Sequence, residues 1–172
     1  TFTVNVNPTP SVTSLPNVTI CSGAQVNLNL TSSVSGSTFS WIANSNANVN
    51  GESSTLQSSS SISDVLVNLT TASQTVIYNI TPTANGCAGT TQTVTVVVNP
   101  NPTLSNLTNL TICSGQSVNL PLTSNVSGVT YSWVAQNNTD VTGESTTAQT
   151  TSTINNVLIN NSTSDQTVTY TV

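Results

Sequence analysis

The residues with the clearest capacity for chemistry in this chain are three cysteines, Cys21, Cys87 and Cys113. Two of them lie in nearly identical sequence motifs, VTICSGAQVNL at residues 18–28 and LTICSGQSVNL at residues 110–120. Thiols form disulfides, bind metals or act as nucleophiles. The sequence has no His, Lys or Arg, so a nucleophilic thiol would lack both a histidine base and a cationic neighbour. Disulfide formation is the chemistry that these cysteines favour.

A thioester is the other covalent bond that the cysteine spacing allows. Gln25 follows Cys21 at four residues, and Gln116 follows Cys113 at three. A second cysteine in the same repeat favours a disulfide over this bond.

The charge of the chain excludes several classes of function. Its only charged side chains are five acids, and its net charge is −5. Without cations it cannot neutralise phosphates, so we expect neither nucleic acid nor an anionic membrane surface as a partner. No apolar run reaches the roughly 20 residues of a membrane span, so we expect no membrane insertion. Catalysis needs a base, an activated nucleophile or a metal, and we expect neither an enzyme nor a cofactor.

Calcium is the one metal that the sequence could hold, because it prefers oxygen ligands, several of them carboxylates. The weak candidates are Asp140 and Glu144, close to Asn137 and Asn138, and the isolated Glu52. The alternative is a solvated loop that ends in a Gly turn, with Glu52 and Glu144 on its rim. The low number of carboxylates favours the loop.

The cysteines and the acidic residues lie within an internal repeat of 92 residues. Residues 1–80 align with residues 93–172 without a gap, and 44 of the 80 positions are identical. Residues 1–7 match Thr93–Asn99. We therefore expect residues 1–8 to be the last strand of a preceding repeat, residues 9–100 a complete module, and residues 101–172 a second module without its final strand.

The hydrophobic pattern within a module has a period of two and is typical of strands. The expected strands are 17–20, 25–30, 38–43, 62–69, 75–81 and 91–98. About seven short strands with a Trp in the third predict an all-β, immunoglobulin-like sandwich, with Pro-bearing connectors holding the modules end to end. Trp41 and Trp133 could be platforms on which sugars stack. However, each is in the same alternating position of its strand as its apolar neighbours, which favours a place in the core. Tyr78 and Tyr170 are expected in the core as well.

The order of these features resembles a known family. TICSG is followed by SW, GES, QTV.Y and TANGCAGT, and the module ends in TVTVVVNPNP. This pattern is similar to the PKD-like repeat modules of Bacteroidota cell-surface proteins, as in SprB-type gliding-motility adhesins exported by the type IX secretion system. The resemblance implies an Ig/PKD-type sandwich and a place in an extracellular surface filament. The WDFGDG motif of polycystic-kidney-type domains is replaced by Trp41-Ile42-Ala43-Asn44, so the roles of its carboxylates do not transfer.

The sandwich topology leaves two pairings open for the cysteines. Cys21 is expected in the turn after the first strand, where the chain leaves the module, and Cys87 in the last hairpin, where it enters. A strand of six residues spans about 20 Å, whereas a disulfide allows only about 4.4–6.8 Å between Cα atoms. Bonds between successive modules are therefore favoured over a Cys21–Cys87 bond. Cys113 would pair in the same way.

The leading functional hypothesis is a structural repeat segment, a stalk that presents a distal adhesive region, whose partners are the neighbouring modules of the same chain. The alternative is that the modules themselves bind surface glycans or other surface proteins, or self-associate. Strand donation between copies is one form of self-association, because residues 1–7 are a spare last strand.

Overall fold

The computed structural model describes residues 1–13, 15–105 and 107–172, and none of these residues is helical. The chain divides into unit 1, Thr1–Asn101, and unit 2, Pro102–Val172. Within the described ranges no helix is long and apolar enough to cross a bilayer. The strands of unit 1 are β1 (Val18–Cys21), β2 (Leu28–Asn29), β3 (Thr38–Ala43), β4 (Val49–Asn50), β5 (Ser61–Ile62), β6 (Val67–Asn68), β7 (Gln74–Ala84), β8 (Cys87–Ala88) and β9 (Gln92–Asn99).

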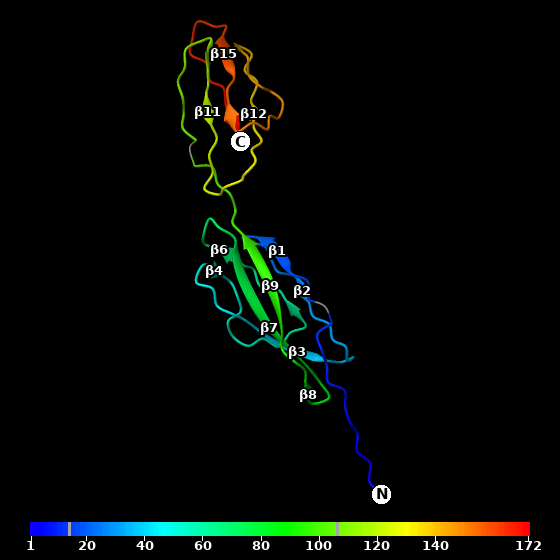
Figure 1. Cartoon of the computed structure of the whole chain (residues 1–172). Coiled ribbons are helices and arrows are strands. Elements are labelled where there is room, and N and C mark those ends of the chain that lie inside the picture. Colours follow the sequence, from blue (N-terminus) through cyan, green and yellow to red (C-terminus); the bar gives the residue numbers. More distant parts are fainter. Residues whose placement is uncertain (14, 106) are drawn as a thin grey trace. The chain divides into compact units, whose positions relative to one another are not determined.

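One layer of unit 1 is a sheet in the order β1-β9-β7-β3, with β8 added to the end of β7. β7 and β9 form its centre and lie side by side in Figure 1. They run antiparallel, with Tyr78 opposite Val94. β1 runs parallel to β9 on the other side, with Val18 opposite Val96. Buried and less buried residues alternate along β7 and β9, so one face of this sheet is covered.

The second layer of unit 1 consists of two short pairs, β2 with β5 and β4 with β6. The core lies between the layers. The second layer contributes apolar side chains such as Leu28, Ile62 and Leu66, and the first layer contributes the buried residues of β3, β7 and β9. Unit 1 is therefore a two-layer sandwich held by one apolar core.

Unit 2 repeats this pattern with shorter strands. They are β10 (Gln116–Ser117), β11 (Leu120–Pro121), β12 (Val134–Ala135), β13 (Val141–Thr142), β14 (Thr153–Ile154), β15 (Val157–Asn160) and β16 (Tyr170–Thr171). Its core is centred on Leu122, Trp133 and Ile154, against which Tyr170 and Val172 pack partly buried. Leu110–Cys113, which aligns with β1, forms no strand.

The structure agrees with the all-β sandwich predicted from the sequence and differs at several boundaries. Residues 25–30 and 62–69 were expected as continuous strands. In the structure only short parts of these ranges form strands, namely β2 in the first range and β5 and β6 at the two ends of the second. Asn27 has a φ of 51°, a left-handed conformation that interrupts a strand. Cys21 is the last residue of β1 and does not lie in the turn that follows. Residues 1–8 are in no strand, and their assignment as the last strand of a preceding repeat stays a prediction.

Candidate functional site

Both tryptophans lie in the cores of their units. Trp41 and Trp133 are 4% and 3% exposed. The Trp41 Nε1–H donates to the Ser59 carbonyl oxygen at 3.2 Å, and the Trp133 Nε1–H donates to that of Thr151 at 3.0 Å. The Trp41 ring meets Tyr78 edge to face, and the Trp133 ring meets Tyr170 in the same way, with ring centroids 5.8 and 5.9 Å apart. Because the rings are covered, neither can stack on a sugar from solvent.

A carboxylate in unit 1 joins the core tyrosine to a loop. The Tyr78 hydroxyl donates to Asp64 Oδ2 at 2.8 Å. Asp64 also accepts the backbone N–H of Ser53 at 2.7 Å and its hydroxyl at 2.8 Å. Burial, followed by the hydrogen bond to Asp64, raises the pKa of Tyr78 well above its ordinary value. Asp64 is therefore a structural acceptor at the edge of the core.

Unit 2 makes the same junction with an amide. Asn156 aligns with Asp64, and its Oδ1 accepts the Tyr170 hydroxyl at 3.1 Å. Its Nδ2 donates to Ser145 Oγ at 2.8 Å. Burial, followed by the negative charge of Glu144, raises the pKa of Tyr170. Tyr170 is half-buried, although Tyr78 is fully buried.

The sequence analysis did not single out Asp64, although its pattern carried a signal. Asp64 is in phase with the buried residues Ile62 and Leu66. An acid on the inward face of a strand region needs a hydrogen-bonding partner. The spacing along the chain does not identify Tyr78 as that partner.

The candidate calcium ligands hold loops by hydrogen bonds. Glu52 Oε1 accepts the backbone N–H of Asn46 at 3.0 Å, and Glu144 Oε1 accepts that of Asn138 at 3.1 Å. Asp140 is exposed, and its backbone N–H donates to Asn138 Oδ1. Among the described residues no group of three or more His, Cys, Asp or Glu lies close enough to hold a metal ion. A loop without bound calcium therefore stays the prediction, and the two glutamates stabilise their loops through these hydrogen bonds.

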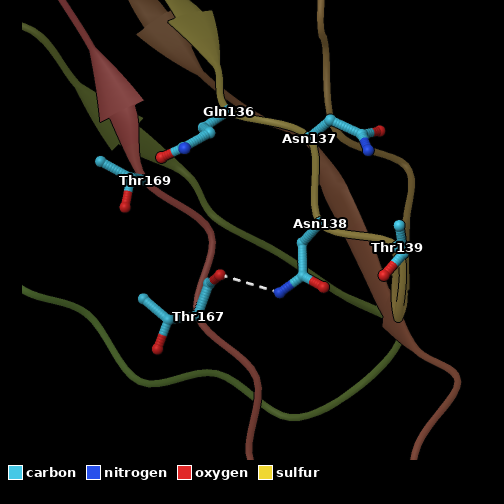
Figure 2. A pocket seen from close by; sticks show the side chains of 6 residues that line it. All are labelled: Gln136, Asn137, Asn138, Thr139, Thr167 and Thr169. Atoms are coloured by element: carbon cyan, nitrogen blue, oxygen red, sulfur yellow. Dashed lines mark hydrogen bonds between the residues drawn. The ribbon is translucent and has the colours of Figure 1, made fainter.

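A shallow depression of about 360 Å³ lies next to this loop in unit 2. Figure 2 shows the six residues that line it, Gln136, Asn137, Asn138, Thr139, Thr167 and Thr169. Asn138 Nδ2 donates to the Thr167 carbonyl oxygen at 3.0 Å. All six side chains are polar and uncharged. The depression therefore offers neither a charged group nor an aromatic face to a ligand.

All three cysteines are free thiols in the structure, with Cys21 and Cys113 exposed. Cys21 pairs with Asn99 at one end of β9. Cys87 lies in the hairpin of β7 and β8, past the other end of β9, where Gln92 pairs with Ile80. Seven residue steps along β9 already separate the two ends by about 23 Å, so a Cys21–Cys87 bond is incompatible with the folded unit. Bonds between modules stay a prediction.

The fold and the residues of both cores define the chain as a tandem of immunoglobulin-type β-sandwich units. The PKD-like domain family matches residues 18–102 and 110–172. The chain belongs to this family.

No curated protein matches the chain. Similar solved structures include DIP-gamma IG1+IG2, at 12% identity and a TM-score of 0.36, covering 88% of this chain and 82% of that one. Another is Dpr2 Ig1-Ig2 in complex with DIP-Theta Ig1-Ig3, at 12% identity and a TM-score of 0.38. That match covers 95% of this chain and 65% of the other.

Proposed function

We propose that this chain is a structural repeat segment of a large bacterial cell-surface adhesin. Its units form part of an extracellular stalk that presents a distal adhesive region, and the adhesin serves gliding motility. The observation that carries the proposal is the repetition of one PKD-like unit at an offset of 92 residues, with 44 of 80 positions identical. Repeats of this kind build length by adding similar units.

The composition supports a structural role. The acids that could have served catalysis or metal binding instead accept hydrogen bonds from loop backbones, as Glu52, Asp64 and Glu144 do. The buried side-chain nitrogen and oxygen atoms of the described residues all have hydrogen-bond partners. The units thus use their few charged groups to hold loops in place.

Two measurements on the intact protein test this function. Antibodies raised against the chain should label the outside of unpermeabilised cells. In-frame deletion of one 92-residue repeat should shorten the surface fibre by about 36 Å, the length of an 11-residue strand such as β7, without loss of adhesion by the distal region. Labelling that requires permeabilised cells, or a deletion that abolishes adhesion at unchanged fibre length, would contradict the proposal.

A second candidate function, binding by the units themselves, is favoured by exposed apolar residues at repeated positions. Val65 and Val67 in unit 1 align with Val157 and Ile159 in unit 2, and all four are exposed. Clusters of exposed apolar side chains often mark protein contacts. Binding of the purified chain to surface glycans or surface proteins, lost on changing Val65 and Val157 to Thr, would support this function over the stalk.

A further inference from the structure

The outer face of the second layer of unit 1 has an apolar centre. Residues 61–69 run along the middle of this layer, between β2 and β4. Their inward side chains, Ile62 and Leu66, are buried in the core, so the side chains that alternate with them point to solvent. Among these, Val65 and Val67 are 49% and 39% exposed. We call Val65 and Val67 the outer apolar pair of unit 1.

Unit 2 has the same pair, although it lacks other exposed apolar residues of unit 1. Val157 and Ile159 align with the outer apolar pair of unit 1 and are 49% and 46% exposed. We call them the outer apolar pair of unit 2. Three other exposed apolar residues of unit 1 align with smaller or polar residues in unit 2, namely Leu56 with Ala148, Leu69 with Asn161, and Ile77 with Thr169.

Strand propensity does not explain an apolar pair at these positions. Threonine favours a strand as valine and isoleucine do, and it occupies outward positions elsewhere, such as Thr93 and Thr95 of β9. Exposure of a larger apolar surface to water is unfavourable. A contact that covers the two pairs explains why both units have aliphatic side chains at these positions and not threonine.

Uncharged polar residues flank each outer apolar pair. Gln25 and Asn50 lie opposite the pair of unit 1, and Ser117 and Thr142 lie opposite the pair of unit 2. An apolar centre with a polar rim is the usual anatomy of a protein interface. Amides and hydroxyls both donate and accept hydrogen bonds. Such a rim therefore complements a second copy of itself, and it offers no counter-charge to a charged partner.

We propose that the outer face of the second layer in one copy of the chain packs on the same face in a second copy, with the outer apolar pairs in contact. This inference rests on the second candidate function, binding by the units themselves, and identifies the partner as the chain itself.

The size of the face indicates how the copies associate. Three strands cover about 14 Å across a sheet and residues 61–69 cover about 27 Å along it, so one face offers about 380 Å². A stable interface needs about 800 Å² from each partner, so the face of one unit gives only a weak contact. A partner with the same face at the same interval along its chain can engage more than one face at once, which raises the overall affinity. A second copy is such a partner.

A carboxylate distinguishes the two faces. Asp140 is exposed and lies two residues before Thr142, on the same outward side of its strand. Its counterpart in unit 1 is Asn48. Because the chain has no cationic side chain, a second copy has none that could pair with Asp140. The contact is therefore stronger through the face of unit 1 than through that of unit 2.

Sedimentation of the 172-residue chain over a range of concentrations tests the association. We expect the average mass to rise with concentration, and to rise further when NaCl screens the repulsion between two negative copies. Val65→Thr combined with Val67→Thr should weaken the association about tenfold or more, because the contact loses buried methyl groups from both copies.

Ile77→Thr combined with Val97→Thr is the matched control, since these residues lie on the outward side of β7 and β9 in the first layer. The near-ultraviolet circular dichroism of the buried tryptophans shows whether each variant keeps its fold. A chain that stays monomeric at every concentration, or equal effects of the two double variants, would overturn the proposal. Neither result would affect the fibre-length test of the stalk.

Removal of the carboxylate tests the contact in the opposite direction. Asp140→Asn makes the face of unit 2 resemble that of unit 1 and should strengthen the association. Asp165→Asn is the control, because it removes the same charge from an exposed residue that aligns with Ser73, just before β7. An equal or larger gain from Asp165→Asn would exclude the outer face of the second layer as the contact.

Discussion

Asp64 and Asn156 occupy the same position in the two units, and each accepts the hydroxyl of the tyrosine beside it. The carboxylate receives two further hydrogen bonds from Ser53. The amide in unit 2 also accepts the backbone N–H of Ser145 through Oδ1, but its nitrogen donates to the Ser145 hydroxyl. The side chain at position 64 or 156 therefore needs an acceptor oxygen facing the tyrosine hydroxyl. Its second polar atom, which faces the serine hydroxyl, can be an acceptor or a donor, because a hydroxyl can act as either.

This arrangement predicts that Asp64→Asn is tolerated and that Asp64→Ala is not. The amide can reproduce the contacts of Asn156, so we expect the free energy of unfolding of unit 1 to fall by less than about 1 kcal/mol. Alanine leaves the buried Tyr78 hydroxyl without its acceptor, which costs about 1–3 kcal/mol. Urea unfolding followed by NMR signals of unit 1 measures both values. Equal losses for the two variants would contradict the assigned role.

The raised pKa of Tyr78 predicts a loss of stability at alkaline pH. The folded unit binds the phenolic proton more tightly than the unfolded chain, in which the pKa is about 10. This contribution is complete below pH 10 and is lost as the pH rises beyond it, by up to about 1.4 kcal/mol per pH unit. Urea unfolding at several values between pH 7 and 11.5 should show the fall, and Tyr78→Phe should reduce its slope. An unchanged slope in the variant would exclude Tyr78 as the cause.

At the scale of elements, glycine positions decide where loops pass close to strands. Gly51 has a φ of 96°, and a Cβ at this position would overlap the carbonyl oxygen of Val65. Gly143 stands in the same relation to Val157 in unit 2. Gly36 also has a positive φ, of 75°, but has open space around it.

We therefore expect Gly51→Ala to destabilise unit 1 more than Gly36→Ala. The positive φ alone costs about 1–2 kcal/mol in either variant. Overlap with the Val65 carbonyl adds roughly 1–3 kcal/mol, by analogy with overpacked sites. Thermal or urea unfolding of the two variants gives the comparison, and a larger loss for Gly36→Ala would show that the loop can move away from Val65.

The position of the two cysteines at opposite ends of β9 predicts the result of oxidation. Mild oxidation of the dilute, folded chain should produce no Cys21–Cys87 disulfide. The same oxidation in denaturant is the control, because the unfolded chain can bring the two thiols together. Mass mapping of unreduced chymotryptic peptides distinguishes the products. A Cys21–Cys87 peptide from the folded chain would contradict the observed register of β1, β9 and β7.

The sequence predicted the long strands of the first layer better than the short strands of the second. β3 was predicted with its observed bounds, and β7 and β9 nearly so, because each alternates buried and less buried residues over six or more positions. The second layer lies near loops whose conformation depends on single residues such as Asn27 and Gly51. The Asp64–Tyr78 contact could not be predicted, because it depends on how the two layers face each other.

At the scale of the whole molecule, the 92-residue repeat was the most informative feature of the sequence. It gave the equivalent positions on which the comparisons of Asp64 with Asn156 and of Gly51 with Gly143 depend. Differences between equivalent residues could be predicted less well. Asp64 accepts a hydrogen bond from the Ser53 hydroxyl, whereas the equivalent Asn156 donates one to the Ser145 hydroxyl, and the alignment alone does not give this difference.

The parallel pairing of β1 with β9 has a mechanical consequence for unit 1. If the chain is pulled from its two ends, the load reaches Val18 from one direction and Asn99 from the opposite one. The four residue pairs from Val18–Val96 to Cys21–Asn99 are then loaded in shear and bear the force together, instead of opening one after another. We expect single-molecule pulling to rupture unit 1 in one abrupt step at high force, and stepwise opening at low force would contradict this. A unit of this kind would transmit traction along a tether without becoming longer itself.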